Sequence, residues 1–120
     1  MPEPVNPIYY QIISKMILDP KSYGILKEFL SALDKYEFEY EIPENRYMIK
    51  IKGNIIGSTC DSLPEINFEQ NKGKIINIFY KSDNIEFSIF IYQKRPPIIV
   101  RIPKSWRITY KKPYLYIFFN

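Results

Sequence analysis

The stretch of sequence that decides the fold class is residues 36–52, YEFEYEIPENRYMIKIK. Up to Ile42, aromatic and aliphatic residues alternate with glutamates, and after Pro43 the alternation resumes with lysines. A period of two residues is typical of a strand with one buried face. This stretch therefore predicts a β-hairpin.

The hairpin has one register that keeps like residues on one face, provided that residues 43–46 form its loop. The predicted pairs are Ile42 with Tyr47, Tyr40 with Ile49, Phe38 with Ile51, Glu39 with Lys50 and Glu37 with Lys52. Aromatic and aliphatic residues then form a core face, while opposite charges face each other in solvent. The predicted core face is Phe38, Tyr40, Ile42, Tyr47, Ile49 and Ile51, and the solvated face carries Glu37, Glu39 and Glu41.

Two helix starts precede the hairpin. Asn6 and Asp19 each place a capping side chain before a proline, and proline is favoured at the first helical position. We expect a first helix over Pro7–Leu18 and a second over Pro20–Lys35.

Further strands follow the hairpin. Residues 74–81 and 85–93 predict a second hairpin with Asp83-Asn84 as its loop and Lys81 facing Glu86. Prolines then separate three shorter strands, at residues 98–102, 106–110 and 114–119. The predicted fold is α+β, with an N-terminal helix or helix pair packed on a twisted, mainly antiparallel sheet of about six to eight strands. Residues 1–120 are expected to form a single compact domain.

The composition is that of a soluble globular protein, with 46% hydrophobic and 25% charged residues among 120. No apolar run reaches the length of a membrane span, so we expect no membrane contact. The first residues, MPEPVNP, carry no basic side chain and differ from a signal peptide. We expect an intracellular, cytoplasmic protein.

The absence of histidine excludes several kinds of catalysis. Ser-His-Asp and Cys-His catalysis and HExxH zinc sites all need an imidazole. One cysteine, Cys60, cannot build a zinc ribbon, and no phosphate-binding glycine loop is present. The glutamates of the first hairpin face lysines, which favours a solvated face over a metal site. We therefore expect no enzymatic activity, no cofactor and no metal.

The C-terminal quarter of the chain is strongly basic. Between Ile91 and Asn120 there is no acidic residue, and Trp106, Tyr110, Tyr114 and Tyr116 are interleaved with cations. The seven basic residues are Lys94, Arg95, Arg101, Lys104, Arg107, Lys111 and Lys112. Cations with aromatic rings are typical of nucleic-acid binding. The alternative is a solvated basic surface above buried rings.

The predicted first helix is apolar on almost every side. One side can face the sheet, and the other needs either the second helix or another chain to cover it. The candidate interface is Tyr9, Tyr10, Ile13, Met16 and Ile17. The function favoured by the sequence is that of a non-enzymatic interaction or assembly protein that forms a homodimer. Nucleic-acid binding through the basic C-terminal strands is the alternative.

Overall fold

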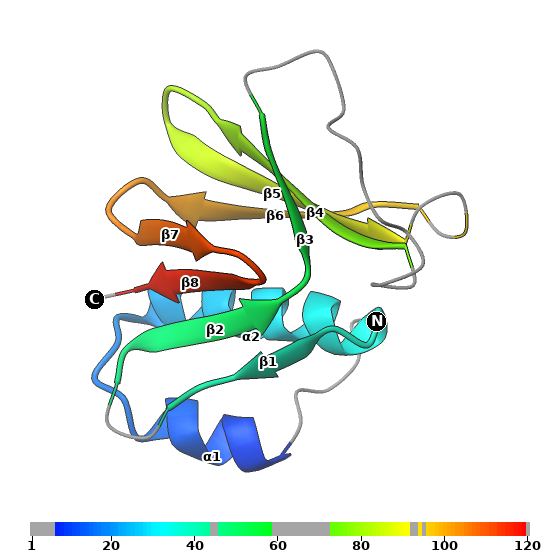
Figure 1. Ribbon diagram of the computed structural model, residues 1–120. Coiled ribbons are helices and arrows are strands. Elements are labelled where there is room, and N and C mark those ends of the chain that lie inside the picture. The colour runs from blue at the N-terminus through cyan, green and yellow to red at the C-terminus, as the bar shows by residue number, and fades with distance from the viewer. Residues whose placement is uncertain (1–6, 44–45, 59–72, 92–93, 95, 120) are drawn as a thin grey trace.

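The fold is described here from a computed structural model, for residues 7–43, 46–58, 73–91, 94 and 96–119, without the side chains of 7–10 and 54–58. Within these residues the chain forms two helices and eight strands (Figure 1). The elements are α1 (Pro7–Ser14), α2 (Pro20–Lys35), β1 (Glu39–Glu41), β2 (Met48–Lys52), β3 (Asn54–Ser58), β4 (Lys74–Tyr80), β5 (Asn84–Ile91), β6 (Ile98–Pro103), β7 (Arg107–Lys111) and β8 (Tyr114–Phe118).

The strands form two sheets of four. Sheet A has the order β1-β2-β8-β7, and sheet B has the order β3-β4-β5-β6. β3 runs parallel to β4, and every other pairing is antiparallel. The prediction of an α+β, mainly antiparallel fold is confirmed. The prediction of one sheet was wrong, because the strands divide into two.

The chain crosses from one sheet to the other at two bends. Gly53 separates β2 from β3, and its N–H donates to the Pro113 carbonyl at 3.2 Å. A Cβ at this position would lie 3.3 Å from the Phe38 ring, so glycine permits a close approach there. The second bend lies between β6 and β7, where the Trp106 N–H donates to the Pro103 carbonyl at 3.1 Å.

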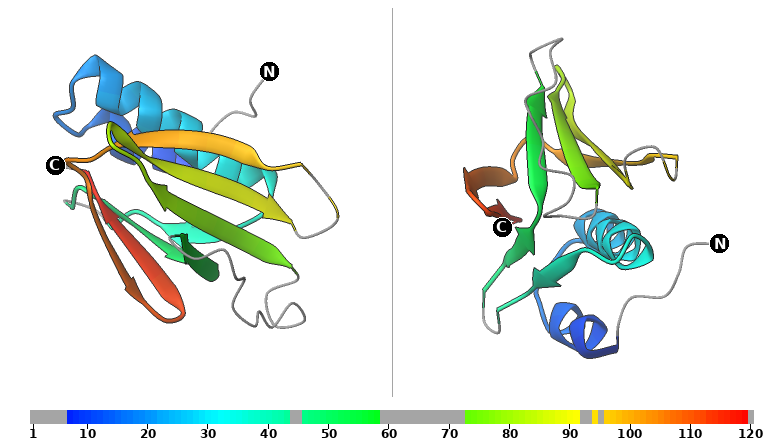
Figure 2. Two further views of the ribbon diagram at one scale, coloured as in Figure 1. Left: turned by 90° about the horizontal axis from the view of Figure 1, so that it is seen from above. Right: turned by 45° about the vertical axis from the view of Figure 1, so that its right-hand side comes forward.

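Helix α2 packs against both sheets. It lies behind sheet A in the view of Figure 1 and contacts β6 of sheet B (Figures 1 and 2). Its Phe29 and Phe87 of β5 are both fully buried, with ring centroids 5.0 Å apart in an edge-to-face arrangement. The same hydrophobic cluster includes Ile51 of β2 and Leu115 of β8, so both sheets share one core.

The helix boundaries agree with the prediction for α2 but not for α1. The Asp19 side chain accepts from the Ser22 N–H at 3.2 Å, as the predicted cap requires. Helix α1 ends at Ser14, four residues before the predicted Leu18. The Ile17 N–H donates to the Tyr47 hydroxyl at 2.8 Å, so this contact replaces a further helical turn. No helix among the described residues is long and apolar enough to cross a membrane.

The first hairpin keeps its predicted faces in a different register. The observed pairs are Glu39 with Lys52, Tyr40 with Ile51 and Glu41 with Lys50, which is a shift of two residues. Strand β1 is also shorter than predicted, because residues 36–38 form hydrogen bonds with the last turn of α2 and not with β2. The Glu37 N–H donates to the Asp34 carbonyl, and Glu37 has a positive φ of 58°.

The second hairpin is shifted in the same way. Tyr80 pairs with Ile85 and Ile78 with Phe87, so the loop is Ser82-Asp83 and not Asp83-Asn84. Lys81 nevertheless contacts Glu86, at 3.2 Å between Nζ and Oε1. In both hairpins a shift of two residues leaves each side chain on its predicted face.

Candidate nucleic-acid interface

The side of sheet A that faces away from the core carries cations and aromatic rings. Ile49 and Ile51 of β2 and Leu115 and Ile117 of β8 are fully buried, so their neighbours along each strand point outward. We call this side the outer face. Its main residues are Glu39 and Glu41 of β1, Lys50 and Lys52 of β2, Tyr114, Tyr116 and Phe118 of β8, and Arg107, Thr109 and Lys111 of β7.

The registers of the three strand pairs align these residues in rows across the sheet. The rows are Glu39–Lys52–Tyr114–Lys111, then Glu41–Lys50–Tyr116–Thr109, then Met48–Phe118–Arg107. A column of three rings on β8 therefore lies between cations on β2 and cations on β7. The two carboxylates are confined to the β1 side, where they face the lysines.

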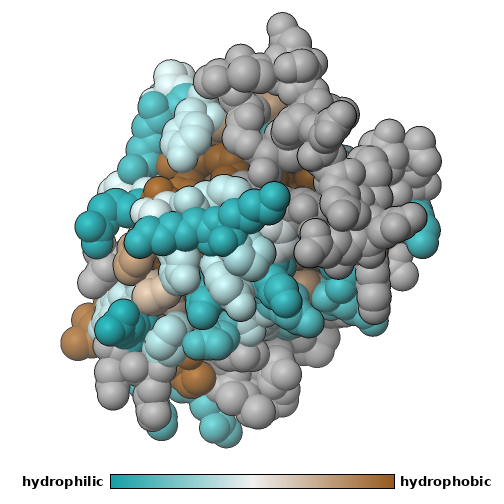
Figure 3. Space-filling view, viewed as in Figure 1, coloured by the Kyte–Doolittle hydropathy of each residue, from teal (hydrophilic) through white to brown (hydrophobic). Residues whose placement is uncertain are grey.

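The rings are partly exposed and lie within reach of the protein's own cations. The centroids of Tyr114 and Tyr116 are 6.5 Å apart. Lys50 Nζ lies 4.2 Å from the centroid of Tyr114, and Arg107 Cζ lies 5.2 Å from that of Phe118. Each cation is thus held over a ring by its attraction to the ring face. Long hydrophilic side chains are visible across this side of the molecule in Figure 3.

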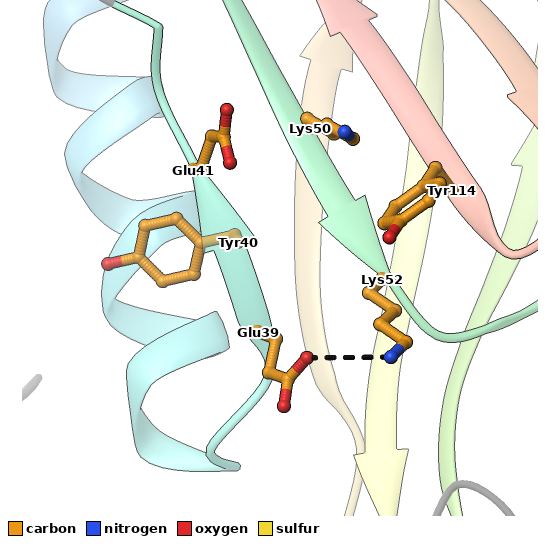
Figure 4. A pocket seen from close by; sticks show the side chains of 6 residues that line it. All are labelled: Glu39, Tyr40, Glu41, Lys50, Lys52 and Tyr114. Carbon is orange, nitrogen blue, oxygen red and sulfur yellow. Dashed lines mark ion pairs between the residues drawn. The ribbon is translucent and has the colours of Figure 1, made fainter.

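A shallow pocket lies at the β1 side of the outer face (Figure 4). Its volume is about 190 Å³, which is small for a site that encloses a ligand. Glu39 and Lys52 approach to 3.9 Å with both side chains well exposed, so this ion pair is weak. Tyr40 points away from the lysines, and its hydroxyl donates to Asp34 Oδ1 at 2.6 Å.

The seven basic residues predicted from the sequence do not gather on one face. Arg107 and Lys111 lie on the outer face, with Lys112 exposed in the turn after β7. Arg101 lies on sheet B, where its Nη2 is 3.1 Å from Glu86 Oε1. Lys94 and Lys104 are exposed in connections, and Arg95 lies outside the described residues.

The aromatic residues of the same segment divide as well. Trp106 is buried in the core, against Phe119, with centroids 5.5 Å apart. Tyr110 is 41% exposed. Tyr114 and Tyr116 join the outer face, so the segment supplies both core and surface rings.

Sequence reasoning missed Lys50 and Lys52 as partners of these rings. They belong to the part of the chain outside the basic segment, which has a net charge of −3 once seven cations are subtracted from +4. The alternation with Ile49 and Ile51 places both lysines outward. No local signal shows that β8 lies beside them.

Of the residues of the predicted protein interface whose side chains the structure describes, only Ile17 is well exposed. Ile13 is fully buried in the core, and Met16 is partly buried against it. Ile17 is 90% exposed. The side chains of Tyr9 and Tyr10 lie outside the described residues.

The part of the chain that the structure describes holds no group of three or more His, Cys, Asp or Glu residues that could bind a metal. Cys60 lies outside the described residues, so its role stays a prediction. No protein-family model matches the chain, and the comparisons with curated proteins and with solved structures returned no match.

Proposed function

We propose that the chain binds single-stranded nucleic acid on the outer face of sheet A. The observation that carries the proposal is the column of Tyr114, Tyr116 and Phe118 on a central strand, between Lys50 and Lys52 on one side and Arg107 and Lys111 on the other. Proteins that hold single strands combine cations for the phosphates with rings on which the bases stack.

The interaction energies favour a stacked base over the cation that now lies over Tyr114 and over Phe118. A cation over an exposed ring contributes about 0.5–1 kcal/mol. A base stacked on an aromatic side chain contributes about 1–3 kcal/mol. Lys50 and Arg107 can therefore leave Tyr114 and Phe118 for phosphate oxygens, and the exchange adds both a stacked base and a favourable charge interaction.

The carboxylates on β1 restrict where the bound nucleic-acid strand can lie on the sheet. Glu39 and Glu41 repel phosphates, so the polyanion is confined to β2, β8 and β7. Interactions of this kind are made with phosphates and ring faces and not with base edges. Binding is therefore expected to depend little on sequence.

Fluorescence anisotropy with labelled DNA and RNA oligonucleotides tests the proposal. The wild type should bind single strands more tightly than duplex of the same length, and binding should weaken steeply with salt. The double variant Lys50→Glu with Arg107→Glu should abolish binding. Replacement of any one phosphate-binding side chain should lower the slope of log affinity against log salt by about 0.7.

The matched control changes the net charge equally at exposed lysines outside the outer face. Lys15→Glu with Lys21→Glu meets this requirement, because Lys15 follows α1, Lys21 lies in the first turn of α2, and both side chains are exposed. Arg101→Glu should also leave binding unchanged, since Arg101 lies on sheet B. An equal loss of affinity in the outer-face and control variants would contradict the proposal, because it would show that only net charge matters.

A second test separates stacking from charge. Tyr116→Leu removes the ring and should reduce affinity by the value of about one stacked base, 1–3 kcal/mol. Tyr116→Phe keeps the ring and should bind like the wild type. An effect of the same size in both variants would exclude stacking on this residue.

The second candidate function is self-association, and it is favoured by the exposure of Ile17. Ile17 lies three residues after the end of α1 and is 90% exposed, and a second copy of the chain would cover this apolar side chain in the proposed dimer. Light scattering on a sizing column should give a dimer mass that Ile17→Asp reduces to a monomer without loss of thermal stability. Met16 is partly buried against the core, so Met16→Lys is expected to lower the thermal stability of the chain itself. A monomer at high protein concentration would end this proposal.

A further inference from the structure

A groove runs along the edge of β7 that lies opposite β8. Residues 106–109 line it together with Tyr80, Ile85 and Lys104, and its volume is about 470 Å³. Consecutive residues of a strand point to opposite faces, so a groove that touches Arg107, Ile108 and Thr109 in a row lies at the edge of β7. β8 pairs with the other edge, so this edge is the one without a strand partner among the described residues.

The groove has an apolar floor and a basic rim. Trp106 and Ile85 are buried at its base. Tyr80, at the end of β4, is 57% exposed and therefore presents much of its ring to solvent. Lys104 and Arg107 are both exposed, and no acidic residue is among the described residues that line the groove. This lining complements a ligand that carries both a flat apolar group and negative charge.

The groove is continuous with the outer face of sheet A. Arg107 and Thr109 belong to both, because β7 is the last strand of that sheet and its edge forms the boundary. A ligand that crosses β7 from the outer face to the groove thus stays in contact with basic side chains along its whole path.

We infer that the groove is an extension of the nucleic-acid site, an inference that rests on the function proposed above. A single strand bound on the outer face continues over β7 and stacks a further base against Tyr80. The adjoining phosphates lie between Arg107 and Lys104, at the edge of β7 that lies opposite β8.

A length series tests this inference, with homopyrimidine oligonucleotides of about four and about ten nucleotides. Only the longer oligonucleotide can cover the outer face and reach the groove. The wild type should bind it more tightly, and Tyr80→Ala should reduce that gain by roughly tenfold, the value of one stacked base. The affinity of Tyr80→Ala for the short oligonucleotide should equal that of the wild type.

Two further variants make the result specific. Tyr80→Phe keeps the ring and should restore the gain, while Lys104→Glu should lower the salt dependence for the longer oligonucleotide alone. A thermal melt of each variant confirms folding, which is expected because both side chains are exposed. DNA and RNA series run in parallel show which sugar the site prefers, and a reduced length gain in either one supports the groove.

The possible failures are distinguishable. Absence of binding by either oligonucleotide would overturn the proposed function, and the inference with it. Binding without a gain in affinity with length, or a Tyr80→Ala effect that is equal at both lengths, would overturn the inference alone. A third outcome would also overturn the inference: the chain binds an extended acidic peptide in a way that depends on Tyr80, while Tyr80→Ala leaves the gain in nucleic-acid affinity with length unchanged. The edge of β7 would then be a site where a peptide adds as a further strand.

Discussion

The contact between Phe29 and Phe87 is expected to hold helix α2 against sheet B. Phe29 lies on α2 and Phe87 on β5 of sheet B, and both are fully buried with centroids 5.0 Å apart. Removal of a fully buried phenyl ring costs about 3–5 kcal/mol, and an edge-to-face pair contributes about 0.5–1.5 kcal/mol beyond burial. Phe29→Ala should therefore remove about 3–5 kcal/mol of the free energy of unfolding.

A double-mutant cycle in urea measures the part that belongs to the ring pair. Phe29→Leu and Phe87→Leu are made singly and together, because leucine keeps part of the volume and the variants should remain folded. Their coupling should be about 0.5–1.5 kcal/mol. Phe119 packs against Trp106 instead, so the control pair Phe29→Leu with Phe119→Leu should be additive. A coupling of zero for the first pair, or a Phe29→Ala cost under about 1 kcal/mol, would refute this account of the core.

Three further predictions concern the first hairpin and the cap of α2. Phe38 is buried, so Phe38→Ala should cost about 3–5 kcal/mol in urea unfolding, whereas a surface-like cost would place its ring outside the core. Glu39→Ala should cost about 1 kcal/mol or less, because its contact with Lys52 is exposed, and a larger cost would show a stronger pair than the geometry allows. The hydrogen bonds from Ser22 hold the pKa of Asp19 below its usual value, so the ionised cap stabilises the fold above the unfolded pKa, and this contribution is lost as pH falls through the folded pKa. Asp19→Ala should therefore lower the melting temperature near neutral pH and differ less from the wild type in acid, and a difference that does not change with pH would contradict the role of the charge.

Local signals in the sequence predicted the elements whose causes are local. Helix α2 has its predicted boundaries, because the cap and the proline at its start are adjacent in sequence. Helix α1 ends early because Ile17 donates to Tyr47, a contact across 30 residues that leaves no mark in the sequence around α1. The division into two sheets has a similar origin. Gly53 is visible as a possible turn, but the sequence does not show that the strands on its two sides join different sheets.

The sequence predicted to which face of the sheet each side chain of the candidate site points, but it did not predict which strands lie side by side. The outward direction of Lys50 follows from the burial of Ile49 and Ile51, and a shift of the hairpin by two residues does not change it. Tyr116 likewise points outward because Leu115 and Ile117 do not. What makes these two residues part of one surface is the pairing of β2 with β8, which joins segments more than 60 residues apart. Periodicity carries no information about such a pairing.

The same reasoning explains why the charge of a sequence segment was a poor guide to the charge of a surface. The basic segment contributes Arg101 to sheet B, where Glu86 pairs with it, and contributes Arg107 to sheet A, where no outer-face carboxylate of the described residues lies in the same row. The cations on the other side of β8, Lys50 and Lys52, come from a part of the chain that is acidic overall. Because antiparallel sheets place strands from distant segments side by side, the electrostatic character of a face is set by strand order. A basic surface is therefore assembled here from one basic and one acidic stretch of sequence, and its binding should respond to charge reversal at Lys50 but not at Arg101.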